Sequence, residues 1–295
     1  MDPFHTLRRR RRLRERLKTA FGVTLTVIVC GLLIAVGLMR AGAIDLPTGV
    51  GGGTAADAAD AADGQSPPGT PFEGTPAADF GEFDDLEFPK AKATRHFDKQ
   101  TVADALKSLR SMLKAGRVDW PEKPQKPADF AERFAPSLRD DVMDILSGPG
   151  RLGHVSALLE GRSLVAAPRV SGTFSVNETI DANTVRSIEI RADLVWAYAF
   201  DGPLFVPGDN LLVLNTQQVW EFTTDDEVRA ADVGLWPREV DFFAQNVECG
   251  HFNDGYLSSF RNDPAQSGDG SGAYSDPDPA YEPGVDLSTM PDDCA

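Results

Sequence analysis

The chain has 295 residues, of which 41% are hydrophobic, and a formal net charge of −16. Residues 1–40 hold nine of the 29 lysines and arginines but only two of the 45 acidic residues, so the rest of the chain has 20 basic and 43 acidic residues and a net charge of −23. Such an acidic surface repels nucleic acid and anionic lipid head groups, which argues against a nucleic-acid-binding protein.

The first predicted element is a membrane span. Residues 1–19 form a basic segment with five consecutive arginines, and residues 20–39 carry no charge. As a helix, this run would measure about 30 Å, the thickness of the hydrocarbon core of a bilayer. Eight Lys and Arg precede the span and only Arg40 follows it closely, so the positive-inside rule places the N-terminus in the cytoplasm. The sequence therefore predicts a single-pass protein of the cell membrane with an extracytoplasmic C-terminal part.

Cleavage of the span is the alternative. Ala41-Gly42-Ala43 offers the small residues of a signal cleavage site, although the apolar run is longer than the roughly 7 to 15 residues that are usual in a secretory signal. In both cases the rest of the chain is exported.

The cysteines are interpreted in the light of that compartment. Cys30 belongs to the span, which leaves Cys249 and Cys294 in an oxidising environment, where a disulfide is expected. The bridge can close within one chain or between two chains. No cysteine or histidine spacing is typical of zinc, and we expect no metal and no cofactor.

Low-complexity segments are expected on both sides of one folded domain. Residues 40–94 contain three Ala-Ala-Asp units with clustered Gly and Pro, and residues 256–295 are rich in Asp, Pro, Gly and Ser. Segments of this composition cannot bury enough apolar surface to fold. We therefore expect a disordered acidic spacer at 40–94, a folded extracytoplasmic domain at 95–255 and a disordered acidic tail at 256–295.

The first half of the folded domain is expected to be helical. Apolar residues recur at helical spacing between a capping Asp98 and a terminating Gly116; they are Val102, Ala105, Leu106, Leu109, Met112 and Leu113. A second helical region is expected at 127–148, broken at Pro136, and a third short helix at 154–159.

The second half alternates as strands do. Strands are expected at 162–180, 183–200 and 211–223, and alternation continues at 228–236. In the second strand one face holds Ile188, Ile190, Ala192, Leu194, Trp196, Tyr198 and Phe200; in the third it holds Leu212, Leu214, Thr216, Gln218, Trp220 and Phe222. Residues 237–249 fit either a last strand or a helix. Helices followed by a curved antiparallel sheet make an α+β domain.

This order of elements resembles the NTF2-like, cone-shaped fold. Residues 98–146 match its helical half, and the strands with DLVWAYAF and QQVWEF match its curved sheet. A single span followed by such a domain is similar to single-pass actinobacterial membrane proteins and to VirB8-like secretion or conjugation subunits. The resemblance covers roughly 160 residues and rests on element order. It implies a fold and an envelope location, and no activity is carried over with it.

A search for chemistry yields only pocket candidates. NTF2-like enzymes such as ketosteroid isomerase place an acid and a tyrosine deep in the cone. Tyr198 lies on the expected inner face, whereas Glu189 and Asp193 lie on the outer one. The candidate ligand-binding residues are Tyr198, Trp196, Gln218 and Trp220, and no residue is assigned a catalytic role.

The sequence therefore favours a protein-interaction module. We expect a membrane-anchored extracytoplasmic domain that binds another protein of the bacterial cell envelope and has no enzymatic activity. The alternative is a small-ligand-binding or enzymatic function in the interior of the cone, which requires an apolar pocket with a few polar groups. The identity of the partner and the oligomeric state are left open.

Overall fold

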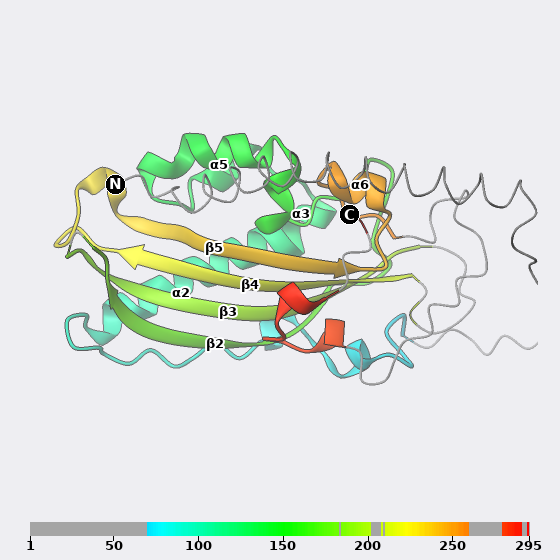
Figure 1. The fold of residues 1–295 in the computed structure, drawn as a ribbon, viewed down its shortest axis with the longest axis horizontal. Helices are drawn as coiled ribbons and strands as arrows, with labels where there is room; N and C mark the ends of the chain where they lie inside the picture. Colours follow the sequence, from blue (N-terminus) through cyan, green and yellow to red (C-terminus); the bar gives the residue numbers. More distant parts are fainter. Residues whose placement is uncertain are drawn as a thin grey trace, which may run out of the picture. The chain divides into compact units, whose positions relative to one another are not determined.

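Four long strands and one short strand form a single antiparallel sheet in the computed structural model (Figure 1). The structure describes residues 70–182, 184–201, 208, 210–259, 279–290 and 294. The strands follow one another in the sheet in chain order; they are β1 (Gly81–Glu82), β2 (Arg169–Ile180), β3 (Arg186–Ala199), β4 (Leu211–Thr223) and β5 (Gly234–Gln245). Since helices precede the long strands, the described part has the predicted α+β class.

The long strands follow the predicted alternation, with two corrections. The strand expected at 162–180 begins only at Arg169. All seven residues that were expected to share one face of the strand at 183–200 are buried. The ambiguous segment after Pro237 is strand, as part of β5. The alternation at 228–236 is wrong in its first part, because Ala230–Asp232 form a 3-10 helix and the strand begins only at Gly234. Gly234 has a φ of 127°, which residues with a side chain avoid.

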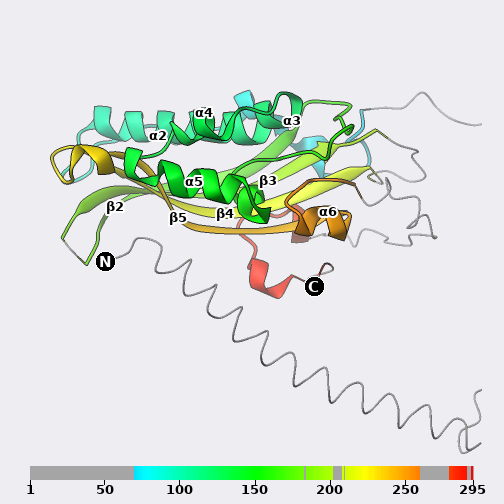
Figure 2. The ribbon, with the colours of Figure 1, turned by 90° about the horizontal axis from the view of Figure 1, so that it is seen from above.

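The helices lie together on one face of the sheet, where Figure 2 shows α2 to α5 as one layer. Their bounds are α2 (Lys99–Leu113), α3 (Trp120–Glu122), α4 (Pro127–Ala131) and α5 (Arg139–Leu146), and a short α6 (Cys249–Asn253) follows β5. As predicted, the Asp98 carboxylate caps α2 by accepting the Thr101 N–H at 2.7 Å. Pro136 lies between α4 and α5, where the break was expected.

The predicted end of the first helix at Gly116 is wrong. α2 passes directly into a π-helix, Lys114–Asp119. A Cβ at Gly116 would lie 2.3 Å from the carbonyl oxygen of His154, so the glycine permits close packing of two backbones and does not terminate the helix. The expected helix at 154–159 is absent, because backbone groups there bond across the fold. The Ser156 N–H, for example, donates to the Gly116 carbonyl at 2.8 Å.

The two faces of the sheet are covered differently. We call the face toward the helices the inner face and the opposite one the outer face. One end of the outer face is apolar, and Figure 2 shows residues 279–290 on this side of the sheet. The buried side chains there are Phe72, Ala77, Val195, Ala197, Ala199, Leu211, Val213, Ala280 and Tyr281. The fold therefore extends beyond both predicted boundaries, since residues 70–80 and 279–290 cover apolar surface that water would otherwise contact.

The predictions for the N-terminal part fall outside the described residues. These are the basic segment 1–19, the membrane span 20–39 and most of the spacer. Among the helices that the structure describes, none is both long and apolar enough to cross a bilayer. The membrane topology stays a prediction.

Candidate functional site

The four pocket candidates lie on the inner face and are fully buried. Their exposed fractions are at most 1% for Trp196, Tyr198, Gln218 and Trp220. The Tyr198 hydroxyl lies 2.6 Å from the Ser156 hydroxyl, and the Gln218 amide donates to the Gly153 carbonyl at 2.8 Å. The Trp220 indole N–H donates to the Gln218 amide oxygen at 3.2 Å. The polar atoms of Tyr198, Gln218 and Trp220 therefore bond to protein groups, whereas the Trp196 indole N–H has no partner among the described residues.

Trp196 contributes to apolar packing. Its ring stacks on Phe83, with centroids 5.9 Å apart. Phe83 comes from residues 70–94, which the sequence analysis had assigned to the spacer. Two surface hollows that described residues line lie elsewhere, one at Val185, residues 225–229 and Asp232, and the other within residues 119–129.

Arg117 is the buried polar residue that the sequence analysis missed. Its side chain has an exposed fraction of 0%, and its guanidinium donates to the Gly153 carbonyl at 2.8 Å and to the Ser156 hydroxyl at 3.2 Å. Its Nε has no partner among the described residues, and burial lowers the pKa of the guanidinium. Position 117 is four residues after the buried Leu113, so continuing the apolar stripe of α2 would have found it.

We call the buried polar residues Arg117, His154, Ser156 and Tyr198 the inner cluster. Burial determines the protonation states of its titratable groups. Burial, helped by the charge of Arg117, lowers the pKa of His154 to about 4. Burial raises the pKa of Tyr198 to about 12, against the opposing effects of Arg117 and Ser156. At neutral pH the imidazole is neutral and the phenol is protonated, so neither has a pKa near the range that suits a general acid or base. The hydrogen bonds from Tyr198 to Ser156 and from Gln218 to Gly153 connect the turn at 153–156 to the sheet.

The outer face divides into a covered half and an open half. The covered half is the apolar end described above. On the open half, β2 presents three exposed polar residues, Thr173, Ser175 and Asn177, and β3 presents Glu189, Arg191 and Asp193. These acids lie on the outer face, as expected. The exposed strand residues and the charged row together form a polar, mainly acidic surface.

Two glutamates face each other directly on the open half. Glu189 on β3 pairs with Glu221 on β4, an arrangement that repels. Burial raises the pKa of Glu221; Glu189 acts in the same direction, whereas Arg238, whose Nε lies 3.1 Å from the carboxylate, opposes the shift. A further cation is therefore favoured at this position.

The covered half shows how the outer face holds a segment from elsewhere in the chain. We call residues 279–290 the C-terminal strap. The Asn215 amide donates to the carbonyls of Ala280 and Glu282, at 3.3 and 2.9 Å. The Gln217 amide donates to the carbonyl of Val285. Both side chains project from β4 and bond to main-chain oxygens of the strap, so these hydrogen bonds do not depend on the side chains of the strap, although Ala280 and Tyr281 add apolar packing.

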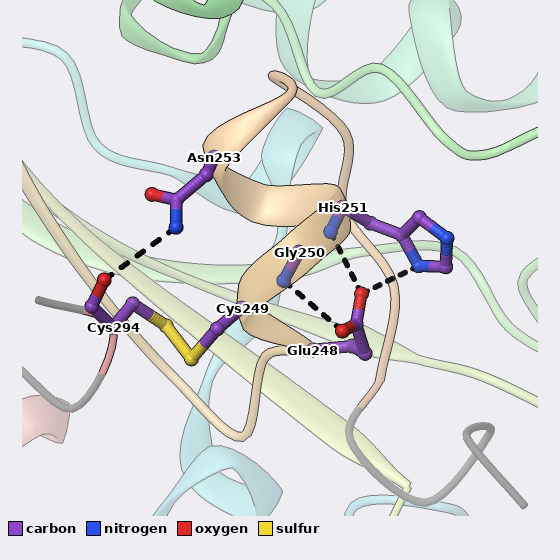
Figure 3. Close-up of a disulfide and its surroundings, with 6 residues drawn as sticks. All are labelled: Glu248, Cys249, Gly250, His251, Asn253 and Cys294. Atoms are coloured by element: carbon purple, nitrogen blue, oxygen red, sulfur yellow. Dashed lines mark hydrogen bonds and ion pairs between the residues drawn. A yellow bond between two sulfur atoms is a disulfide. The ribbon is translucent and has the colours of Figure 1, made fainter. Parts of the chain in front are cut away.

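A disulfide attaches the chain beyond the strap to α6 (Figure 3). Cys249 and Cys294 are joined within one chain, which is one of the two pairings that the sequence allowed. The Glu248 carboxylate accepts the backbone N–H groups of the two residues that follow Cys249, and the Asn253 amide donates to the Cys294 carbonyl at 3.5 Å. The bridge therefore starts from a capped helical turn.

Metal binding and family membership receive no support. Within the described part of the chain, no group of three or more His, Cys, Asp or Glu is placed to hold a metal ion. No protein-family model, no curated protein and no solved structure matches this chain. The functional argument therefore rests on the site itself.

Proposed function

We propose that this chain is a membrane-anchored extracytoplasmic protein-interaction module of the bacterial cell envelope, with an NTF2-like domain and no catalytic role. The open half of the outer face is its docking surface. The observation that carries the proposal is the division of this face: one half already holds a separate segment of the chain, the strap, through main-chain carbonyls, and the other half is exposed. The predicted span at 20–39 would keep the domain at the membrane, with residues 40–69 as a spacer.

The partner segment is expected to present main-chain carbonyls and to be basic. Side-chain amides of β4 satisfy main-chain carbonyls on the covered half, and the hydroxyls and amide of Thr173, Ser175 and Asn177 offer similar groups on the open half. Glu189 and Glu221 face each other there, so a lysine or arginine from a partner would relieve their repulsion. Such charge complementarity favours encounter with a basic partner over an acidic one.

The alternative is a ligand or an enzymatic activity inside the cone. It would need polar groups free to meet a ligand. The Tyr198 hydroxyl and the Gln218 amide instead bond to Ser156 and Gly153. No contact among the described residues favours this alternative over docking on the outer face.

Site-specific photo-crosslinking tests the proposal. A photoreactive residue replaces Arg191, in the middle of the open half, or Asp144, an exposed residue of α5 on the helical side. The full-length chain is kept in its native membrane, and adducts are identified by mass spectrometry. We expect a defined envelope protein to be captured from position 191 and not from position 144.

A charge variant provides the second arm of this experiment. Glu189→Lys should reduce capture from position 191 severalfold, because it removes an acid and repels a basic partner. Asp144→Lys makes the same charge change on the other side and should leave capture unchanged. Equal capture from both positions, or capture that Glu189→Lys does not alter, would contradict the proposed docking surface.

A further inference from the structure

The two edges of the sheet differ in how they are protected. β5 has several features that prevent pairing with another strand: it contains Pro237 and three charged residues, and its register against β4 shifts at Val219 and Trp220. The Leu235 carbonyl also accepts the Ala135 N–H at 3.2 Å. Proline, charge, bulges and covering segments are the devices by which natural sheets block their edges.

Among the described residues, the edge of β2 is covered only through its inner-face side chains: Phe88 stacks on Phe174, with centroids 4.4 Å apart, and Thr94 bonds to Glu178. β1 pairs only with Arg169 and Val170. From Ser171 to Ile180 the outer backbone groups bond to nothing in the described part of the chain, over about 34 Å of extended strand. This stretch contains no proline and no lysine. Its one acid, Glu178, is already held by groups of the same chain.

The free part of β2 is complementary to itself. If two copies pair antiparallel about a two-fold axis at Ser175, the outer-face pairs are Ser175 with Ser175, Thr173 with Asn177, and Ser171 with Thr179. The inner-face pairs are Phe174 with Val176 and Gly172 with Glu178. Hydroxyls and amides thus meet on the outer face. On the inner face Phe174 meets Val176, Gly172 leaves room beside Glu178, and no like charges are opposed.

A neighbouring register lacks this match. An axis at Val176 would place Phe174 opposite Glu178 and Ser171 opposite Asp181. Pairing along β2 also suits the charge of the protein. Each copy carries −23 beyond residue 40, whereas the edge from Ser171 to Ile180 holds a single acid, so two copies approach there with little local repulsion.

We infer that the β2 edge binds a second copy of this chain, antiparallel about a two-fold axis at Ser175, so that the two five-stranded sheets become one continuous sheet. This interface uses the edge of β2 and leaves the charged residues of β3 and β4 on the open half accessible. It therefore stands independently of the proposed function, and two joined domains would present two docking surfaces on the same side of the sheet.

Cysteine crosslinking tests the interface and its register. Ser175→Cys is made in the full-length chain with Cys30→Ser, reconstituted in lipid nanodiscs. Directly opposed residues have Cβ atoms about 4.5–5.5 Å apart, close enough to form a disulfide under mild oxidation. Arg191→Cys is the matched control: it is the β3 neighbour of Ser175 on the same face, but its two copies would be three strand spacings apart, about 14 Å. We expect a disulfide-linked dimer from position 175 and none from position 191.

A charge swap at the same position tests the pairing without a covalent bond. Ser175→Lys and Ser175→Glu should each weaken the dimer severalfold, because like charges meet on the axis, and mixing the two chains should restore it. Masses of the assemblies in detergent, measured by light scattering, give the readout, and thermal unfolding checks that each variant is folded. A monomeric wild-type chain, equal crosslinking at 175 and 191, or single variants that remain as dimeric as the wild type would overturn the inference.

Discussion

Removal of the Cys249–Cys294 disulfide should lower the stability of the protein substantially. The bridge closes a loop with a sequence separation of 45. In the chain-entropy model such a loop contributes about 4 kcal/mol, because the crosslink restricts the unfolded chain. Folded domains are stable by only about 5–15 kcal/mol, so a chain with Cys249→Ser and Cys294→Ser should unfold at a clearly lower denaturant concentration.

The measured loss is expected to lie between about 2 and 4 kcal/mol, the usual range for such bridges. Denaturant unfolding of the full chain in detergent can be followed by tryptophan fluorescence, since Trp196 and Trp220 are fully buried. Wild-type chain treated with a thiol reductant should show the same loss, and Cys30→Ser should show none. A loss below about 1 kcal/mol would refute the reasoning, and so would a bridge that joins two chains on a non-reducing gel.

Three further predictions concern the inner cluster and the glycine beside it, Gly116. Gly116→Ala should lower the free energy of unfolding by about 3 kcal/mol, because the new Cβ would lie 2.3 Å from the His154 carbonyl oxygen and overpack the core. Gly148→Ala is the control: no atom lies nearer than 3.9 Å to its Cβ, so the loss should stay under about 1 kcal/mol. Urea unfolding compares the two variants. Arg117→Met should change the free energy of unfolding by less than about 1 kcal/mol. The substitution removes a buried charge that has no acid partner among the described residues, and Gln218 still bonds to the Gly153 carbonyl. A loss above about 3 kcal/mol would show that the guanidinium is a major stabilising group. His154, with its pKa lowered from 6.5 to about 4, binds a proton more readily when unfolded, so stability should fall by roughly 3 kcal/mol as the pH drops from 6.5 to 4. Urea unfolding at both pH values, with His154→Phe as the reference that lacks this dependence, measures that contribution against the titration of all other groups.

The elements that the sequence predicts well are those whose pattern is local. α2 has a capping Asp98 and an apolar face at helical spacing, and both are found in the structure. β3 and β4 alternate over their whole length, so Tyr198 and Gln218 could be placed on one face before the partners of that face were known. A residue's own neighbours in the chain determine these features.

The inner cluster shows where local patterns fail. Arg117 bonds to Gly153 and Ser156, which lie 36 and 39 residues further along the chain. A charged residue is normally placed at the surface, and Gly116 beside it is a common sign of a helix end. Only the close approach of the Gly116 and His154 backbones shows why this helix continues and why the arginine is enclosed.

The strap was missed because its composition is misleading. Acidic and proline-rich segments usually cannot fold alone, and the strap does not fold alone: Tyr281 and Ala280 are buried against strand residues and Phe72 from the other end of the domain. The signal lay in β3, whose outer face changes from charged residues to Val195, Ala197 and Ala199. An apolar row on a sheet face without helices must be covered by another part of the chain. The segments before and after the predicted domain provide this cover, through residues 70–80 and 279–290.

The docking surface and the dimer edge follow from the same rule, applied to what is left uncovered. Along β3 the outer face is polar up to Asp193 and apolar from Val195, and the chain covers the apolar part and reaches no further than Asp193. The polar part is stable in water and needs no cover, so it stays available to a partner. The β2 edge is different, because unpaired backbone groups invite a strand whatever the side chains are. The chain blocks that tendency at β5. At β2 residues 88–96 contact inner-face side chains but the backbone from Ser171 to Ile180 stays unpaired among the described residues, and its side chains match a second copy of themselves. Dimer formation would thus explain why this backbone edge is left without a partner strand.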